Sequence, residues 1–164
     1  MKKKIETFFF FRINNATAFK SSLKALAPNI TTTTQVLQVS TQPNAIVNIA
    51  FSFTGLVTLG INDTLGDPLF AGGQFADAPM LNDTGTANWV PAFKGTKVHG
   101  LFTVASDSTS FVNAELFSIK ALFGSSISGL YTLQGQARPG AQQGHEREYL
   151  VYIYIPKTVF DIFA

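Results

Sequence analysis

Apolar residues follow strand-like and helix-like periods in a fixed order along this chain, and this order restricts the fold more than any other feature. Four segments are rich in strand formers or alternate between apolar and polar positions. Two others repeat apolar residues at helical spacing. The strands are predicted at 7–13, 45–53, 97–105 and 129–137, and the helices between 15 and 28 and between 107 and 124. The order strand, helix, strand, strand, helix, strand predicts an α+β domain of the ferredoxin-like, split βαβ type.

The first predicted strand, TFFFFRI at 7–13, has apolar side chains on both of its faces. Such a strand suits the centre of a sheet, where both faces are covered. The helices carry apolar stripes formed by Phe19, Leu23 and Leu26 and by Val112, Leu116, Ile119 and Phe123. Because each helix has one such stripe, we expect an antiparallel sheet with both helices on one face.

Two further segments extend this plan within a single predicted domain, 1–164. Residues 54–96 form a long insertion between the second and third strands, with a short helix predicted in TGLVTLGI; insertions of this length are often functional. In the tail, 147–164, residues 149–155 are apolar on both faces and predict a fifth strand, which needs cover from the chain or from a partner. The tail residues expected to contact a partner are Tyr152, Tyr154, Val159, Phe160 and Phe163.

The charge and the apolar runs of the chain argue against nucleic acid as a partner and against a membrane-spanning helix. Charged residues make up 13% of the sequence, against about 25% in typical soluble domains. The formal charge is +2, and it becomes −1 without Lys2, Lys3 and Lys4. No stripe of Lys and Arg with interleaved aromatics follows, so nucleic acid is not expected as a partner. No run of about 18 apolar residues is present, so a membrane-spanning helix is not expected either.

Residue patterns give no support for a metal site or a nucleophilic site. The chain has no cysteine and two histidines, His99 and His145, without HxH or HExxH spacing. The GxSxG motif of serine hydrolases is also absent. His99 lies on a predicted strand, where we expect a hydrogen-bonded and partly buried imidazole. We therefore assign no catalytic, cofactor-binding or metal-binding residue from these patterns, and we expect no cofactor.

Four Asn-x-Thr sequons suggest a secreted glycoprotein. They begin at Asn15, Asn29, Asn62 and Asn82, and such sequons are glycosylated only in proteins that enter the secretory route. We therefore expect an extracellular location.

Three long stretches resemble the N-terminal half of fungal dye-decolourising peroxidases. They are NIAFSFTGLVTLGINDTLGDPLFAGGQFADA (48–78), WVPAFKGTKVHGLFTVASDS (89–108) and FGSSISGLYTLQGQARPGAQQGHE (123–146). The resemblance runs from the first strand to Glu146. It implies two ferredoxin-like halves with haem between them, in agreement with the fold that the periodicity predicts.

The resemblance also implies where this chain departs from that family. There the loop after RPG and GHE continues into GFxDG, whose aspartate is the distal acid that helps cleave hydrogen peroxide at the iron. Here Glu146 is followed by REYLV, without a matching aspartate. The proximal histidine and the distal arginine belong to the second half, so no catalytic residue is carried over, and Arg138 and Glu146 match the surrounding loop only.

A second resemblance is to the small, glycosylated subunit of heterodimeric fungal laccases, which looks like a shortened peroxidase half. It implies a non-catalytic accessory subunit, not an enzyme by itself, that stabilises a larger laccase subunit, a multicopper oxidase. Two alternatives remain open. One is a truncated, haem-binding protein similar to a dye-decolourising peroxidase, with His99 or His145 as the iron ligand. The other is an orphan, homodimeric binding module.

Overall fold

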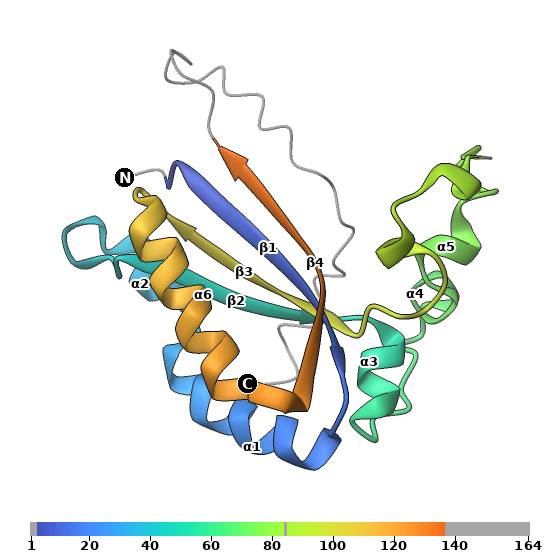
Figure 1. The fold of residues 1–164 in the computed structure, drawn as a ribbon, viewed down its shortest axis with the longest axis horizontal. Helices are drawn as coiled ribbons and strands as arrows, with labels where there is room; N and C mark the ends of the chain where they lie inside the picture. The colour runs from blue at the N-terminus through green and yellow to red at the C-terminus, as the bar shows by residue number, and fades with distance from the viewer. Residues whose placement is uncertain (1–2, 84, 137–164) are drawn as a thin grey trace.

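The structure is a computed structural model that describes residues 3–83 and 85–136. It contains one four-stranded antiparallel sheet in the order β2-β3-β1-β4. Helices α1 and α6 cover one face of this sheet (Figure 1). The bounds of these elements are Ile5–Ile13 (β1), Ala16–Leu26 (α1), Ala45–Phe51 (β2), Gly100–Ser106 (β3), Thr109–Phe123 (α6) and Ile127–Gln136 (β4). The predicted α+β, ferredoxin-like fold is confirmed.

Strand β1 lies in the interior of the sheet because both of its faces are apolar. It pairs with β3 on one side and with β4 on the other. Phe9 and Phe11 join the core beneath the helices, whereas Phe8 and Phe10 belong to a smaller cluster on the opposite face. Phe11 is fully buried and stacks on Phe102 of β3, with 4.9 Å between ring centroids. The run of four phenylalanines therefore supplies both apolar layers of the sheet.

The two covering helices begin and end at local capping signals. Asn15 caps α1, since its Oδ1 accepts a hydrogen bond from the amide of Ala18 at 2.9 Å. Ser108 caps α6 in the same way through Ser110. Gly124 follows α6 with φ of 47°, a left-handed conformation that favours glycine. The predicted stripe of α6 is entirely buried, as are Phe19 and Leu26 of α1.

The second and third strands are shorter than predicted. Strand β2 ends at Phe51, because Ser52 leaves the sheet to cap helix α3 (Phe53–Thr58) by accepting from the amide of Gly55. Strand β3 begins at Gly100, and Val98 packs with the opposite-face cluster instead of with Phe102. The connection between β2 and β3 thus covers 52–99.

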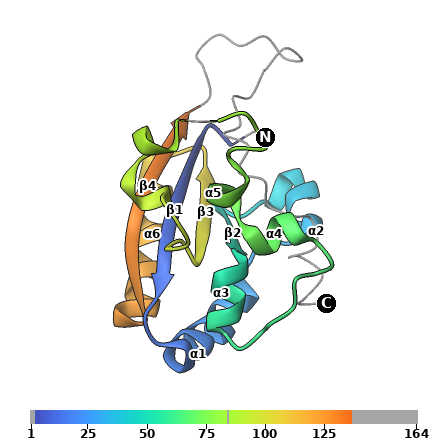
Figure 2. The same cartoon turned by 90° about the vertical axis from the view of Figure 1, so that its right-hand side faces the viewer.

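Short helices fill this connection and the one between α1 and β2. The first holds α3 together with α4 (Pro68–Gly72), α5 (Gln74–Asp77), η3 (Thr86–Asn88) and η4 (Pro91–Phe93). The second holds η1 (Ala27–Asn29), α2 (Thr33–Leu37) and η2 (Val39–Thr41). Helices α3, α4 and α5 lie together at one end of the sheet, away from α6 (Figures 1 and 2). In residues 3–83 and 85–136, no helix has the length and apolar character required to cross a membrane.

The two edges of the sheet differ. On β2, Thr31 occupies both backbone groups of Val47: the amide of Thr31 donates to the carbonyl of Val47 at 2.9 Å, and the amide of Val47 donates to Thr31 Oγ1 at 3.0 Å. On β4, the described residues place no strand beside the outer edge. One edge is therefore capped by a local contact, and the other remains available within the described chain.

Candidate functional site: the open face of the sheet

The face of the sheet opposite α1 and α6, here called the open face, carries an apolar cluster to which all four strands and the insertion contribute. Phe10, Ala50 and Leu101 are its buried members. Around them pack partly exposed side chains from β1, β4 and the insertion: Phe8, Phe93, Val98, Tyr131 and Leu133. A sheet whose second face is this apolar suits contact with another protein layer better than contact with water alone.

Three aromatic rings fix the insertion to the open face. Phe10 of β1 meets Phe93 edge-on at 4.9 Å, and Phe93 meets Tyr131 of β4 at 5.3 Å between centroids. Edge-to-face contacts at such distances are favourable beyond the area they bury. Phe93 was not among the residues predicted to matter, because it lies in a stretch without a regular period; the only signal was an aromatic residue next to Pro91.

His99 joins the ends of three strands just before β3 begins. Its amide donates to the carbonyl of Phe11 at 2.9 Å, and its carbonyl accepts from the amide of Ser52 at 3.1 Å. Its Nδ1 accepts from the amide of Ile13 at 3.2 Å. Helix α3 lies so close that a Cβ added at Gly55 would meet the His99 carbonyl oxygen at 1.9 Å. Only glycine fits at this contact between the insertion and the sheet.

The hydrogen bond to Nδ1 determines what the imidazole of His99 can do. A neutral imidazole that accepts at Nδ1 carries its proton on Nε2, so neither nitrogen has a free lone pair for a metal. Burial, and secondarily the charge of Arg12, lowers the pKa of His99 below 6.5 and favours this neutral form. The expectation of a hydrogen-bonded, partly buried histidine is confirmed. Among the described residues, no three His, Cys, Asp or Glu side chains group as metal ligands.

The predicted glycosylation sites lie at the surface of the described chain. Asn15, Asn29, Asn62 and Asn82 are all exposed. Asn15 uses its Oδ1 to cap α1, which leaves the Nδ2 atom, where a glycan attaches, outside that hydrogen bond. The predicted partner contacts at Tyr152, Tyr154, Val159, Phe160 and Phe163, together with Arg138, His145 and Glu146, fall outside the described residues.

The chain is similar in sequence and in fold to known proteins of one family. A family model described as the DyP dimeric alpha+beta barrel domain matches residues 1–139. Peroxidase 2 of Mycetinis scorodonius is 57% identical over 148 residues, which are 89% of this chain and 29% of that protein. The crystal structure of a decolorizing peroxidase from Auricularia auricula-judae superposes with a TM-score of 0.82 at 46% identity, over 88% of this chain and 32% of the other. A dye-decolorizing peroxidase engineered in its heme pocket matches equally well, with a TM-score of 0.82.

These relatives correct the expectation about enzyme activity, and they support one of the two expected family resemblances but not the other. The expectation that the chain is not an enzyme by itself is wrong, because the proteins it matches are named as peroxidases, which are enzymes. The chain spans less than a third of the length of the curated relatives reported above. The resemblance to an N-terminal peroxidase half is confirmed, whereas the laccase subunit receives no support from these relatives.

Proposed function

Because the chain belongs to the dye-decolourising peroxidase family, through a domain that covers residues 1–139, we propose that it acts as the N-terminal half of a peroxide-dependent, dye-oxidising enzyme. Its relatives carry this activity in their names, and the chain corresponds to 29% of the length of Peroxidase 2. The chain therefore supplies the N-terminal part of such a peroxidase.

The open face is the observation that carries this proposal. The family description names a barrel, and a barrel of this type needs a second sheet against the first. The open face supplies the matching surface, since Phe8, Tyr131 and Leu133 are only partly buried by the described residues. Helices α1 and α6 already cover the other face, so the second half packs against the open face.

Haem is the cofactor that the family implies, and the described residues do not fit it as iron ligands. When haem is bound, it supplies the chemistry of the reaction with peroxide. His99 is the one histidine in the described part of the chain; its Nδ1 accepts from the amide of Ile13, and its Nε2 then carries the proton. We therefore assign no iron ligand to this part; its contribution is the apolar wall formed by the open face.

Complementation of a split peroxidase tests the proposal. The chain would be co-expressed with the remaining, C-terminal portion of Peroxidase 2, and peroxide-dependent dye oxidation would be compared with that of the C-terminal portion alone. We expect the chain to raise activity. Leu133→Asp should abolish the gain by placing a charge on the open face, whereas Thr132→Asp, on the neighbouring residue that pairs with Phe9 on the helix side, should retain it. Equal activity with and without the folded chain would refute the proposal.

Two further proposals concern the location of the protein and its partner: the chain is secreted, and a laccase large subunit is an alternative partner for the open face. Secretion is supported by the four exposed sequons. For the laccase, the open face is also the surface that a larger oxidase subunit would cover. Two parallel pull-downs, one with a laccase large subunit and one with the C-terminal peroxidase portion, distinguish the two candidate partners. We expect the chain to bind the peroxidase portion.

A further inference from the structure

Hydroxyl side chains gather in the connection between α1 and β2. Residues 31–44, here called the threonine segment, read TTTTQVLQVSTQPN and hold five threonines and one serine between Pro28 and Pro43. Residues 32–38 of this segment are all exposed. Segments rich in serine, threonine and proline are typical carriers of O-linked sugars. The threonine segment is therefore a candidate for modification at its hydroxyl groups.

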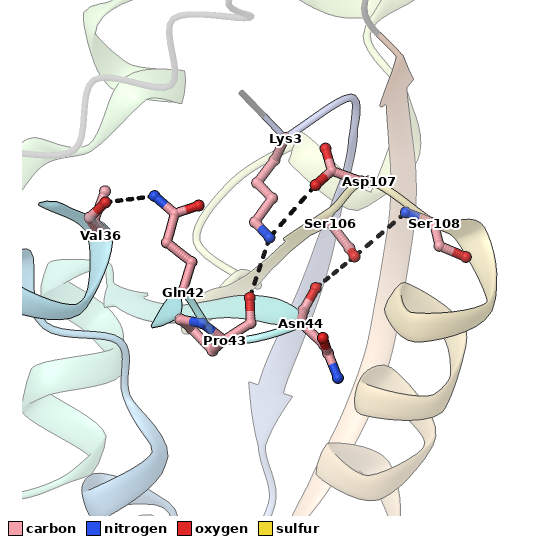
Figure 3. Close-up of polar contacts among 8 residues, drawn as sticks. All are labelled: Lys3, Val36, Gln42, Pro43, Asn44, Ser106, Asp107 and Ser108. Carbon is pink, nitrogen blue, oxygen red and sulfur yellow. Dashed lines mark hydrogen bonds and ion pairs between the residues drawn. The ribbon is translucent and has the colours of Figure 1, made fainter. Parts of the chain in front are cut away.

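Contacts at both ends fix the threonine segment to the sheet. At its start, Thr31 is hydrogen-bonded to the backbone of β2 through its amide and its hydroxyl oxygen. Near its end, Lys3 Nζ donates to the carbonyl of Pro43 at 3.1 Å, and Gln42 Nε2 donates back to the carbonyl of Val36 (Figure 3). The stretch between these contacts is therefore held in place with its side chains exposed.

The four consecutive threonines differ in what their hydroxyl groups do. Thr31 Oγ1 accepts from an amide of β2 at 3.0 Å. Thr32 Oγ1 accepts from the amide of Gln35 at 3.3 Å and donates to its Oε1 at 3.1 Å. Among the residues that the structure describes, the hydroxyl groups of Thr33 and Thr34 take part in no hydrogen bond, and both residues are exposed. These two can carry a substituent on Oγ1 without loss of a contact that the fold uses.

Helical spacing places these two hydroxyl groups beside an exposed apolar residue. In α2, Thr33 and Thr34 precede Leu37 by four and three positions and so share a face with it. The Leu37 side chain is 74% exposed. No charged residue lies between Lys24 and Asp63, although charged groups normally keep a protein surface soluble. Neutral, strongly hydrated groups on the two threonines would supply what the sequence lacks here.

We propose that Thr33 and Thr34 carry O-linked hexoses in the secreted protein, an inference that rests on the secretion proposed above. The donor is a hexose activated as a glycosyl phosphate, which the glycosyltransferases of the secretory route supply. The threonine Oγ1 attacks the anomeric carbon and forms the new C–O bond. The bond from that carbon to the phosphate oxygen breaks, the phosphate leaves with the electron pair, and the hydroxyl proton passes to a base of the transferase.

Export of the full chain from a fungal host, behind a leader peptide of that host, tests the proposal. Chymotrypsin should release residues 27–37, which contain Asn29 and the four threonines. Enzymatic removal of N-glycans and fragmentation by electron transfer then assign each remaining sugar to one residue. We expect hexose on Thr33, Thr34 or both. An exported chain in which these two are bare, or in which the hexose sits on Thr31 or Thr32, overturns the proposal.

A pair of variants gives a matched comparison. The double variant Thr33→Val, Thr34→Val should lose the hexose from peptide 27–37. Thr41→Val, which changes an exposed threonine outside this peptide, should retain it. In protein made without sugars in bacteria, the double variant should unfold at the same temperature as the native chain, because its two hydroxyl groups make no contact. Retention of the hexose by the double variant, or a lower unfolding temperature of its sugar-free form, would contradict the assignment.

Discussion

Replacement of Gly55 by alanine should be among the most damaging single-methyl changes in this protein. Gly55 lies in α3, directly against the backbone of His99. The added Cβ would stand 1.9 Å from the His99 carbonyl oxygen and 2.8 Å from its carbonyl carbon, whereas ordinary contact begins at 3.4 Å. Both neighbours are backbone atoms in the strand junction, so α3 has to move instead.

The size of the effect follows from what this movement disrupts. Forcing extra atoms into a packed site costs about 1–3 kcal/mol. Displacement of α3 also strains the 3.1 Å hydrogen bond from Ser52 to His99, which contributes about 1 kcal/mol. The higher helix propensity of alanine returns at most about 1 kcal/mol. We therefore expect Gly55→Ala to lower the free energy of unfolding by about 1–3 kcal/mol.

Urea denaturation followed by far-UV circular dichroism measures this loss. Gly72→Ala is the control, because Gly72 ends α4 and a Cβ there meets nothing within 4 Å. The control should be neutral or stabilise the protein by less than about 1 kcal/mol. If Gly55→Ala unfolds at the same urea concentration as the native chain, α3 is not packed against His99 as described.

Two further outcomes are expected. Protonation of His99 removes the acceptor for the amide of Ile13, and its pKa is lowered in the folded state, so the free energy of unfolding should decrease as the pH falls below 6.5, until the folded-state pKa is passed. His99→Asn, which keeps an acceptor but does not titrate, should flatten this dependence in pH-resolved urea titrations; an unchanged slope would exclude His99 as its source. In protein secreted from a fungal host, peptide mass spectrometry should find a glycan on Asn62 or Asn82, which are exposed residues of the insertion, and four bare sequons would contradict this route of secretion.

The regular elements were predictable because their signals are local. The strand periods, the caps at Asn15 and Ser108 and the stop at Gly124 each depend on residues close in sequence. Strand ends were less predictable, since the alternation of β2 continues through Ser52 and Phe53, while the chain there already turns into α3. A serine that can either extend a strand or cap a helix is assigned only by its tertiary contacts.

The candidate site required contacts between distant parts of the chain. That an apolar surface would need a partner was expected, but the contacts were predicted in the tail beyond the described residues, whereas the structure adds the open face. The roles of Gly55 and Phe93 depend on His99 and on Phe10, which are far from them in sequence. No hydrophobic period or sequence motif predicts such contacts between residues that are far apart in the chain.

The unequal edges of the sheet limit how copies of this fold can join through their strands. Thr31 already uses the backbone groups of Val47 on the β2 side, so an incoming strand cannot form a continuous ladder there. The outer edge of β4 carries no such contact in the described sheet, since β4 pairs with β1 alone. Indefinite stacking into a fibril needs two competent edges in every molecule. Strand-mediated association of the described sheet should therefore favour the β4 edge over the β2 edge.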